Sequence, residues 1–429
     1  MLTFFAILVL LALLMVFRMP IAFAMGISGF IGLALQLGPR PALSVLERTF
    51  FDSSSSFILV AIPLFILMAE LLTAGDVTRR AIVACQNWIG HFKGGLAMAT
   101  VGASVILAAL VGSSTASTAA MAASAYPEMR RHNYSRRLAA AVVSVGGTLA
   151  VVVPPSIVLV VYGVLTETSI GKLFIAGIMP GLLTAAGLAV VIKIIAHTTD
   201  QAPKGEPFEL RRAVRTSRQV IPMMILLFLV IGAIYGGIAS PSEAAALGVM
   251  GALIIVVVQR TISFASFNRS VSMSIRATVM IVAIVACSAI FSNYLAFTRI
   301  THGLLQFVAT TEMSRTTIMA IIILALLVMG MFMDQLAILS LAMPLAFPIA
   351  MALEFDPVWF GIVVTKTVEI GLLTPPLGLN AYVAAAQTGV PLSRIFRGIV
   401  PFLVMEIVIL LVLLAFPQIT LWLPGLMLR

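Results

Sequence analysis

Long apolar segments follow one another along most of the chain, and a helix of about 20 such residues is long enough to cross a bilayer. Of the 429 residues, 61% are hydrophobic and 10% are charged, whereas a water-soluble domain has about 45–50% apolar and roughly 25% charged residues. The chain therefore has too little polar surface for water, and we predict an all-α polytopic membrane protein. The apolar segments lie near residues 1–17, 20–38, 57–73, 97–127, 138–166, 173–196, 219–238, 243–259, 277–298, 315–352, 358–387 and 396–422.

The basic residues lie in short loops between these segments, and they give a formal net charge of +10. Basic residues in such loops orient a membrane protein in the bilayer, so the charge does not indicate a nucleic-acid partner. Residues 76–92 are amphipathic and are predicted to lie on the membrane surface. Residues 198–218 form a basic hydrophilic loop that divides the chain into two halves.

Four apolar segments are interrupted near their middles. The polar residues 112–118 interrupt segment 97–127, and Gly330 with Asp334 interrupts segment 315–352. Each of these segments is too long for one crossing and too short for two, so we predict a re-entrant hairpin in each. The other two segments contain the strings Pro-Pro-Ser at 154–156 and Thr-Pro-Pro at 374–376. Paired prolines remove backbone donors and break a helix.

The two halves of the chain are related to one another. A shift of 221 positions places residues 112–180 on 333–401 without a gap, and 10 of the 69 paired residues are identical. All four prolines of the first stretch meet prolines of the second, and the interruptions coincide. This pattern indicates an internal duplication, with one hairpin and one broken helix in each repeat.

The charges around the hairpins predict opposite orientations for the two repeats. The first hairpin has basic neighbours, and the second has Arg315 but also two acidic residues, Glu354 and Asp356. By the positive-inside rule, the first hairpin opens to the cytoplasm and the second opens to the other side. The topology then has some ten spans, a cytoplasmic 198–218 loop, and both termini outside. The neighbours of the first hairpin are His91, Lys93, Arg130, Arg131, Arg136 and Arg137.

Open backbone at membrane depth persists where it lines a polar cavity or is buried in protein. Inverted repeats with broken helices at the midplane are typical of secondary transporters, whose free carbonyls bind small cations. We therefore predict two equivalent sodium sites, one in each repeat. The first consists of Ser113, Ser114 and Ser117 facing the break at Pro154, and the second consists of Asp334 with carbonyls around Thr374, Pro375 and Gly378. The alternative for the serines is that they only let helices pack closely.

Charged residues inside the spans indicate either function or pairing. Lys366 lies one helical turn from Glu369, so it either pairs with this carboxylate or attracts an anionic substrate. Glu406 is predicted to be a helix-stabilising or interfacial residue. Our candidate substrate ligands are Lys366, Ser114, Ser156 and Asn380.

Short strings at these interruptions resemble the large membrane subunit of TRAP transporters (tripartite ATP-independent periplasmic transporters). The strings are AIPLF at 61–65, GSS at 112–114, PPSI at 154–157, SIGKLF at 169–174, GIMP at 177–180, EIG at 369–371, TPP at 374–376 and GLN at 378–380. The resemblance implies sodium-coupled, elevator-type uptake of organic anions across the bacterial inner membrane. The termini that the charges place outside are then expected in the periplasm. It also implies two partners, a periplasmic substrate-binding protein and a small four-span membrane subunit.

The resemblance further implies a division into scaffold and transport domains. The scaffold comprises residues 1–95, which include the amphipathic arm, and residues 219–314. The transport domain comprises the first repeat at 96–197 and the second at 315–429, and the basic loop 198–218 lies between them on the cytoplasmic side. Two alternatives remain: a stand-alone sodium/dicarboxylate symporter that needs no binding protein, and an ion channel. An enzyme is not indicated, because the sequence has no HExxH motif and few histidines.

Overall fold

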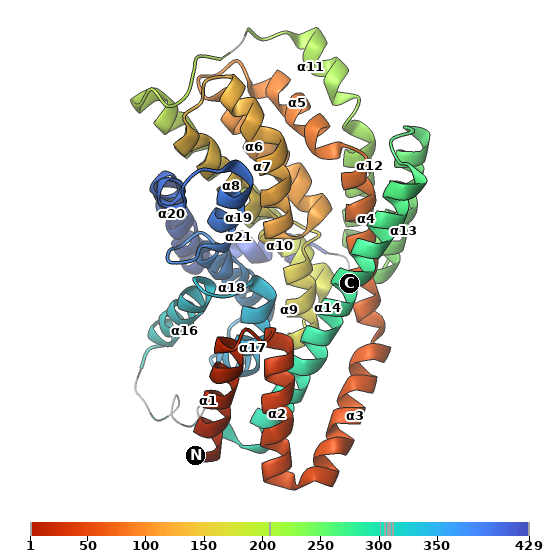
Figure 1. Cartoon of the computed structure of the whole chain (residues 1–429), viewed down its shortest axis with the longest axis vertical. Helices are drawn as coiled ribbons and strands as arrows, with labels where there is room; N and C mark the ends of the chain where they lie inside the picture. Colours follow the sequence, from red (N-terminus) through yellow and green to blue (C-terminus); the bar gives the residue numbers. More distant parts are fainter. Residues whose placement is uncertain are drawn as a thin grey trace.

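The computed structural model describes residues 2–427, except 206, 301, 304–305, 307–309 and 311–312. All regular elements in these residues are helices, as predicted. The helices before the first hairpin are α1 (Leu2–Val16), α2 (Ile21–Leu37), α3 (Pro39–Ser55), the short 3-10 helix η1 (Phe57–Val60), α4 (Ala61–Ala74) and α5 (Val77–Ile89). Helices α5 and α11 lie at the end of the molecule opposite α1–α3 (Figure 1).

Both predicted hairpins and both broken helices are present. In the first repeat they are α6 (Gly95–Val111) with α7 (Ser114–Arg131), and α8 (Arg136–Val152) with α9 (Ile157–Thr166), followed by α10 (Ile170–Thr198). In the second repeat they are α16 (Arg315–Gly330) with α17 (Gln335–Ala352), and α18 (Pro357–Gly371) with α19 (Leu379–Thr388), followed by α20 (Leu392–Ala415) and α21 (Gln418–Gly425). The four interruptions predicted from the sequence are thus confirmed.

The two repeats pack around each other in a reciprocal way. Each hairpin packs on the broken helix of its own repeat, α6 and α7 on α8, and α16 and α17 on α18. Each second hairpin helix also packs on the second half of the other repeat's broken helix, α7 on α19 and α17 on α9. Helices α8 and α18 pack on each other, as do α10 and α20. Packing of each repeat's hairpin on the other repeat's broken helix is expected for an inverted repeat with a pseudo-two-fold axis.

The remaining helices form a second group beside the repeats (Figure 1). It contains α12 (Ile221–Tyr235), α13 (Pro241–Val258) and α14 (Phe264–Phe297), together with α1–α4. Helix α5 packs on α6 and α7 of the first hairpin, and α11 (Leu210–Ser217) packs on α5. Helix α14 packs on α2, α3 and α4, and α13 packs on α4 and α12. Pro241 begins α13 after a capping box between Ser240 and Glu243.

Several boundaries differ from the prediction. Helix α3 lies where no element was expected, and α14 begins at Phe264, 13 residues before the predicted 277. The predicted span 396–422 ends at Ala415, because Pro417 separates α20 from α21. The basic loop 198–218 contains α11, which the hydropathy of the segment does not indicate.

The predicted number of spans is not confirmed. Among the described residues, six helices are long and apolar enough to cross a membrane, or up to eight if each of two bent pairs is one span. One bent pair is α4 with α5, which meet at 68°, and the other is α11 with α12, which meet at 55°. The turn into α5 agrees with an amphipathic arm that lies along a surface.

Candidate functional site

The tip of the first hairpin lies against the break in α8–α9. Gly112 ends α6 with φ +60°, and its carbonyl accepts a hydrogen bond from Ile157 N at 3.4 Å. A Cβ added to Gly112 would lie 3.2 Å from the carbonyl oxygen of Pro155. The backbone conformation and the close approach both favour glycine here. The structure therefore brings together the tip and the break that we predicted to face each other.

Next to this contact, the two repeats are joined by polar side chains. Asn380 at the start of α19 donates from Nδ2 to Ser114 Oγ at 2.6 Å and to the Ser144 carbonyl at 3.5 Å. Ser114 begins α7, so the N-termini of two half-helices, one from each repeat, meet at this hydrogen bond. Both side chains have no exposed surface.

Three buried oxygens of these same helices have no hydrogen-bond partner in the described part of the chain. They are Ser117 Oγ and Thr118 Oγ1 on α7, and Asn380 Oδ1 on α19. A buried polar atom without a partner is costly. Hydroxyl and amide oxygens are hard ligands of the type that suits an alkali cation, so the residues at this tip fit a sodium ion.

The other residues predicted for the first site have different positions. Ser113 is half-buried, with Oγ 3.4 Å from Thr115 Oγ1. Pro154 is buried in the break. Ser156 is also buried, but its hydroxyl donates to the Val151 carbonyl of α8, on the other side of the break, at 2.7 Å. Ser156 can still offer an oxygen as an acceptor, because a hydroxyl has two lone pairs.

The second hairpin meets the second break through two glycines. A Cβ added to Gly330 would lie 2.8 Å from Gly371 Cα, so the ends of α16 and α18 are in backbone contact. Asp334 caps α17, and its carboxylate accepts from Leu336 N at 3.1 Å. Asp334 is half-buried at the hairpin tip, where we predicted it.

Within the second break, Thr374 Oγ1 donates to the Ile370 carbonyl at 2.7 Å. A backbone hydrogen bond spans the break, in which Asn380 N donates to the Leu372 carbonyl oxygen at 3.2 Å. Gly378 precedes α19 with φ +53°. Both breaks contain a cis peptide bond, Pro154–Pro155 in one and Pro375–Pro376 in the other.

The two breaks differ in exposure. Residues 151–156 of the first break are buried, whereas residues 375–377 of the second are exposed. The two repeats are thus equivalent in sequence position but not in surroundings.

Lys366 lies in a buried ion-paired cluster. Its Nζ donates to Glu369 Oε2 at 3.0 Å, to Thr184 Oγ1 at 2.8 Å and to Glu406 Oε2. An ammonium has three hydrogens, so none is left for an anion in this structure. The geometry matches the pairing alternative for Lys366 and Glu369, and a role of Lys366 in binding substrate stays a prediction.

The prediction for Glu406 was wrong in part. Glu406 is fully buried within the protein and ion-paired with Lys366, so it is not exposed at a surface. Its partner is 40 positions away, so no local pattern connects the two residues. The only signal in the sequence was an acid inside an apolar segment. Thr118, Ser144 and Thr184 were also missed, because single hydroxyls are common in membrane helices.

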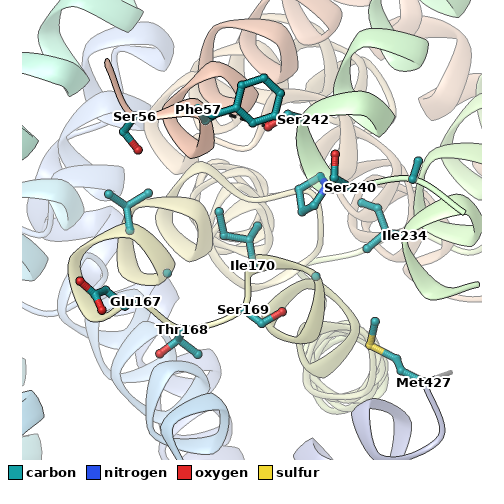
Figure 2. Close-up of a pocket in the computed structure, with 15 residues that line it drawn as sticks. Ser56, Phe57, Glu167, Thr168, Ser169, Ile170, Ile234, Ser240, Ser242 and Met427 are labelled. Carbon is teal, nitrogen blue, oxygen red and sulfur yellow. Dashed lines mark hydrogen bonds between the residues drawn. The ribbon is translucent and has the colours of Figure 1, made fainter. Parts of the chain in front are cut away.

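One cavity, of about 650 Å³, lies away from both tips, between η1, the α9–α10 connection and the start of α13, and Figure 2 shows Ser56, Glu167, Ser169 and Ser240 around it. Residues 157–162 of α9, which correspond to ~9 Å of helix, lie between this cavity and the first break. Among the described residues that line it, Glu167 is the one that is charged, and its carboxylate would repel an anion.

The fold and these broken helices define a membrane protein of the secondary-transporter class. Residues 8–419 match the DctM component of the tripartite ATP-independent periplasmic transporters. The chain belongs to this family, as the sequence resemblance indicated.

Two relatives and one solved structure extend this comparison. The C4-dicarboxylate TRAP transporter large permease protein DctM of Pseudomonas aeruginosa is 37% identical over 403 residues, 94% of each chain. The ectoine/5-hydroxyectoine TRAP transporter large permease protein UehC of Ruegeria pomeroyi is 32% identical over 414 residues, 96% of each chain. The Alcanivorax borkumensis YdaH transporter has a similar fold, with a TM-score of 0.63 over 89% of each chain at 13% identity.

Proposed function

We propose that this permease imports organic anions, coupled to sodium, after a periplasmic binding protein delivers them. The observation that carries the proposal is the contact between Asn380 and Ser114, which joins the N-termini of two half-helices from opposite repeats beside three unpartnered buried oxygens. Half-helix N-termini favour carboxylates, and free oxygens and half-helix C-termini favour cations. This place in the fold thus offers helix N-termini to the carboxylate of the substrate and free oxygens to the sodium ion.

Two or more sodium ions are the proposed coupling ions. In the first repeat, Ser113, Ser114 and Ser117 would supply oxygens near the break at Pro154, and Thr118 and Asn380 add two more. In the second repeat, Asp334 would supply a charged oxygen near the carbonyls of Thr374, Pro375 and Gly378. The support is the chemistry of these donors and the contact of each tip with its own break.

A C4-dicarboxylate is the proposed substrate class. The Pseudomonas aeruginosa relative carries this substrate in its name, and a carboxylate suits the half-helix N-termini at Ser114 and Asn380. Ser156, at the N-terminus of α9, completes the proposed set of polar contacts. We leave Lys366 out of the set, since its hydrogens are used within the protein.

An elevator-type movement of the repeats against the scaffold is the proposed mechanism. The transport domain would comprise 96–197 and 315–429, and the scaffold 1–95 and 219–314, with the loop 198–218 in the cytoplasm. Among hydrogen bonds that join described residues of different helices in these two domains, one links the domains, from Ser288 Oγ on α14 to the Ser340 carbonyl on α17 at 2.8 Å. The salt bridges between described residues all lie within one domain. An apolar boundary of this kind supports sliding.

The proposed surroundings are the bacterial inner membrane, with both termini in the periplasm. The binding protein would dock on that side, and a small four-span subunit would bind the scaffold. The name "large permease protein" of both relatives agrees with a second, smaller subunit.

Uptake into proteoliposomes tests the proposal. The permease is reconstituted with its small subunit, and a labelled C4-dicarboxylate is supplied with or without purified binding protein and an inward sodium gradient. We expect uptake only when both are present. Uptake without the binding protein would favour a stand-alone symporter, and non-saturating flux without a sodium gradient would favour a channel.

A further inference from the structure

Three ionisable side chains without exposed surface meet where the two repeats pack together. Lys366 and Glu369 come from α18, and Glu406 comes from α20. Two acids thus share one base. With both carboxyls ionised, this cluster would hold one uncompensated negative charge away from water, which is highly unfavourable.

Among the described residues, the helices that pack on α18 and α20 place no further charged side chain beside this cluster. Their other charged or titratable groups lie at helix ends or caps, except Tyr162, whose hydroxyl donates to the Pro357 carbonyl, and Tyr382, which is exposed. The groups at ends and caps are Arg136, Arg137, Glu167, Lys172, Lys193, His197, Arg315, Asp334, Asp356, Arg394 and Arg397.

The missing positive charge is not that of a metal ion held by three or more His, Cys, Asp or Glu side chains, because no such group is found within the described ranges. A proton needs no cavity. It also changes a carboxylate from an acceptor into a donor, which the hydrogen bonds can test.

The hydroxyl of Thr148 decides which acid carries the proton. Thr148 Oγ1 lies 2.8 Å from Glu369 Oε1 and 2.8 Å from the Val145 carbonyl oxygen. A hydroxyl has one hydrogen, so an ionised Glu369 would leave two acceptors sharing it. A proton on Glu369 Oε1 resolves this, since it is donated to Thr148, and Thr148 then donates to Val145.

The other two members of the cluster agree with this assignment. Thr184 Oγ1 has the same arrangement, since it donates to the Pro180 carbonyl at 2.9 Å and accepts from Lys366 Nζ at 2.8 Å. Glu406 Oε1 has no partner among the described residues, so a proton there would lack an acceptor. Glu406 is therefore the carboxylate that pairs with Lys366.

We propose that Glu369 is a proton-binding site, which holds one proton on Oε1 between the two repeats. The proton leaves Lys366 and Glu406 as a balanced ion pair and makes the cluster neutral. If the repeats move across the membrane, a consequence that rests on the proposed function, this cluster then carries no net charge through the electric field.

Infrared spectroscopy of the purified permease in lipid nanodiscs at neutral pH tests the site, and it does not depend on transport. The wild-type protein should show a carboxylic-acid C=O band that is lost in Glu369→Gln. Glu406→Gln should lose the same band, because the remaining acid must then ionise to balance Lys366. Glu354→Gln, at an exposed carboxylate, should leave the band unchanged.

A second pair of variants locates the proton. Thr148→Val removes the acceptor of the proposed O–H, so the band should move to higher frequency. Thr184→Val removes a hydroxyl of the same cluster that contacts Lys366, and it should leave the band in place. Absence of the band from the wild-type spectrum would overturn the proposal, and so would a band that Thr148→Val leaves unmoved.

Discussion

Thr148 Oγ1 lies 2.8 Å from Glu369 Oε1, and these residues are 221 positions apart in the chain. The same offset superposes the prolines of the two repeats. A residue that contacts its own equivalent must lie next to the axis that relates the repeats. The hydrogen bond therefore supports the alignment, although Thr148 and Glu369 are chemically different.

Replacement of Lys366 should affect stability more than substrate affinity. Lys366→Met leaves two buried acids without their base, and breaking a buried pair from one side costs about 3–5 kcal/mol. We expect a clearly lower thermal unfolding midpoint, with unchanged half-saturation for substrate in the molecules that remain folded. Lys193→Met, at an exposed lysine of α10, should change neither. A weaker substrate affinity with normal stability in Lys366→Met would instead assign this ammonium to the substrate.

Asp334 should determine sodium dependence. Asp334→Asn keeps a side-chain oxygen for the N-cap of α17 but removes the negative charge at the hairpin tip, so we expect loss of sodium-dependent uptake with normal expression and folding. Asp356 is a matched control, since it also caps a helix and accepts from Val358 N and Trp359 N at 2.8 and 2.9 Å. Asp356→Asn should retain sodium dependence. Unchanged sodium dependence in Asp334→Asn would exclude Asp334 from the cation site.

Most of the apolar helices and all four interruptions could be predicted, because hydropathy and paired prolines are local properties of the sequence. Helix α3 could not, since it contains Arg40, Glu47, Arg48 and Asp52 and has no apolar run of spanning length. It is positioned by packing on α2 and α14, and by a hydrogen bond from Asn293 Nδ2 to Thr49 Oγ1 at 3.0 Å. Such contacts between distant segments leave no local pattern.

The candidate site could also be predicted only in part, because local features of the sequence indicate some of its residues and contacts between distant segments determine the others. The alignment of the repeats pairs the two hairpin tips with each other and the two breaks with each other, so all four were predicted together. The partners of Lys366 were only half predicted, since Glu369 is one turn away on the same helix whereas Glu406 comes from another helix. Which hydroxyl remains without a partner, as in Ser117 and Thr118, depends on the packing of α7 and follows from the tertiary structure alone.

Asn380 should contribute to sodium affinity through the oxygen that has no partner. Asn380→Leu keeps a similar volume but removes Oδ1 and the bond to Ser114. Interactions of a charge with one polar group are worth about 1.5–3 kcal/mol, so the sodium concentration for half-maximal uptake should rise about tenfold or more. Gln387→Leu, at an exposed position of the same helix, is the control. An equal sodium response in Asn380→Leu and the wild type would remove Asn380 from the site.

The proposed topology can be tested with two exposed positions in a background without Cys85 and Cys287. Arg211→Cys lies in the basic segment before α12, and Glu354→Cys lies between α17 and α18. The positive-inside rule places the first in the cytoplasm and the second outside. A membrane-impermeant thiol reagent added to intact cells should label Glu354→Cys and label Arg211→Cys only after permeabilisation. The reverse pattern would invert the topology.

Movement between the proposed domains should require the contact of Ser288 with Ser340 to open. Ser288 Oγ on α14 reaches the Ser340 carbonyl on α17 at 2.8 Å, so a pair of cysteines at these positions can be joined by a short bifunctional thiol reagent. Joining them should stop uptake, and a reducible cross-linker should allow recovery after reduction.

A matched pair within the scaffold separates this effect from general damage. Ser242 Oγ on α13 donates to the Phe57 carbonyl of η1 at 3.4 Å, which is the same kind of contact between elements of one domain. Cysteines at 57 and 242, joined by the same reagent, should leave most uptake intact, because neither element moves relative to the other in an elevator. Full uptake after joining 288 to 340 would show that α14 and α17 do not slide, and the elevator mechanism would then fail.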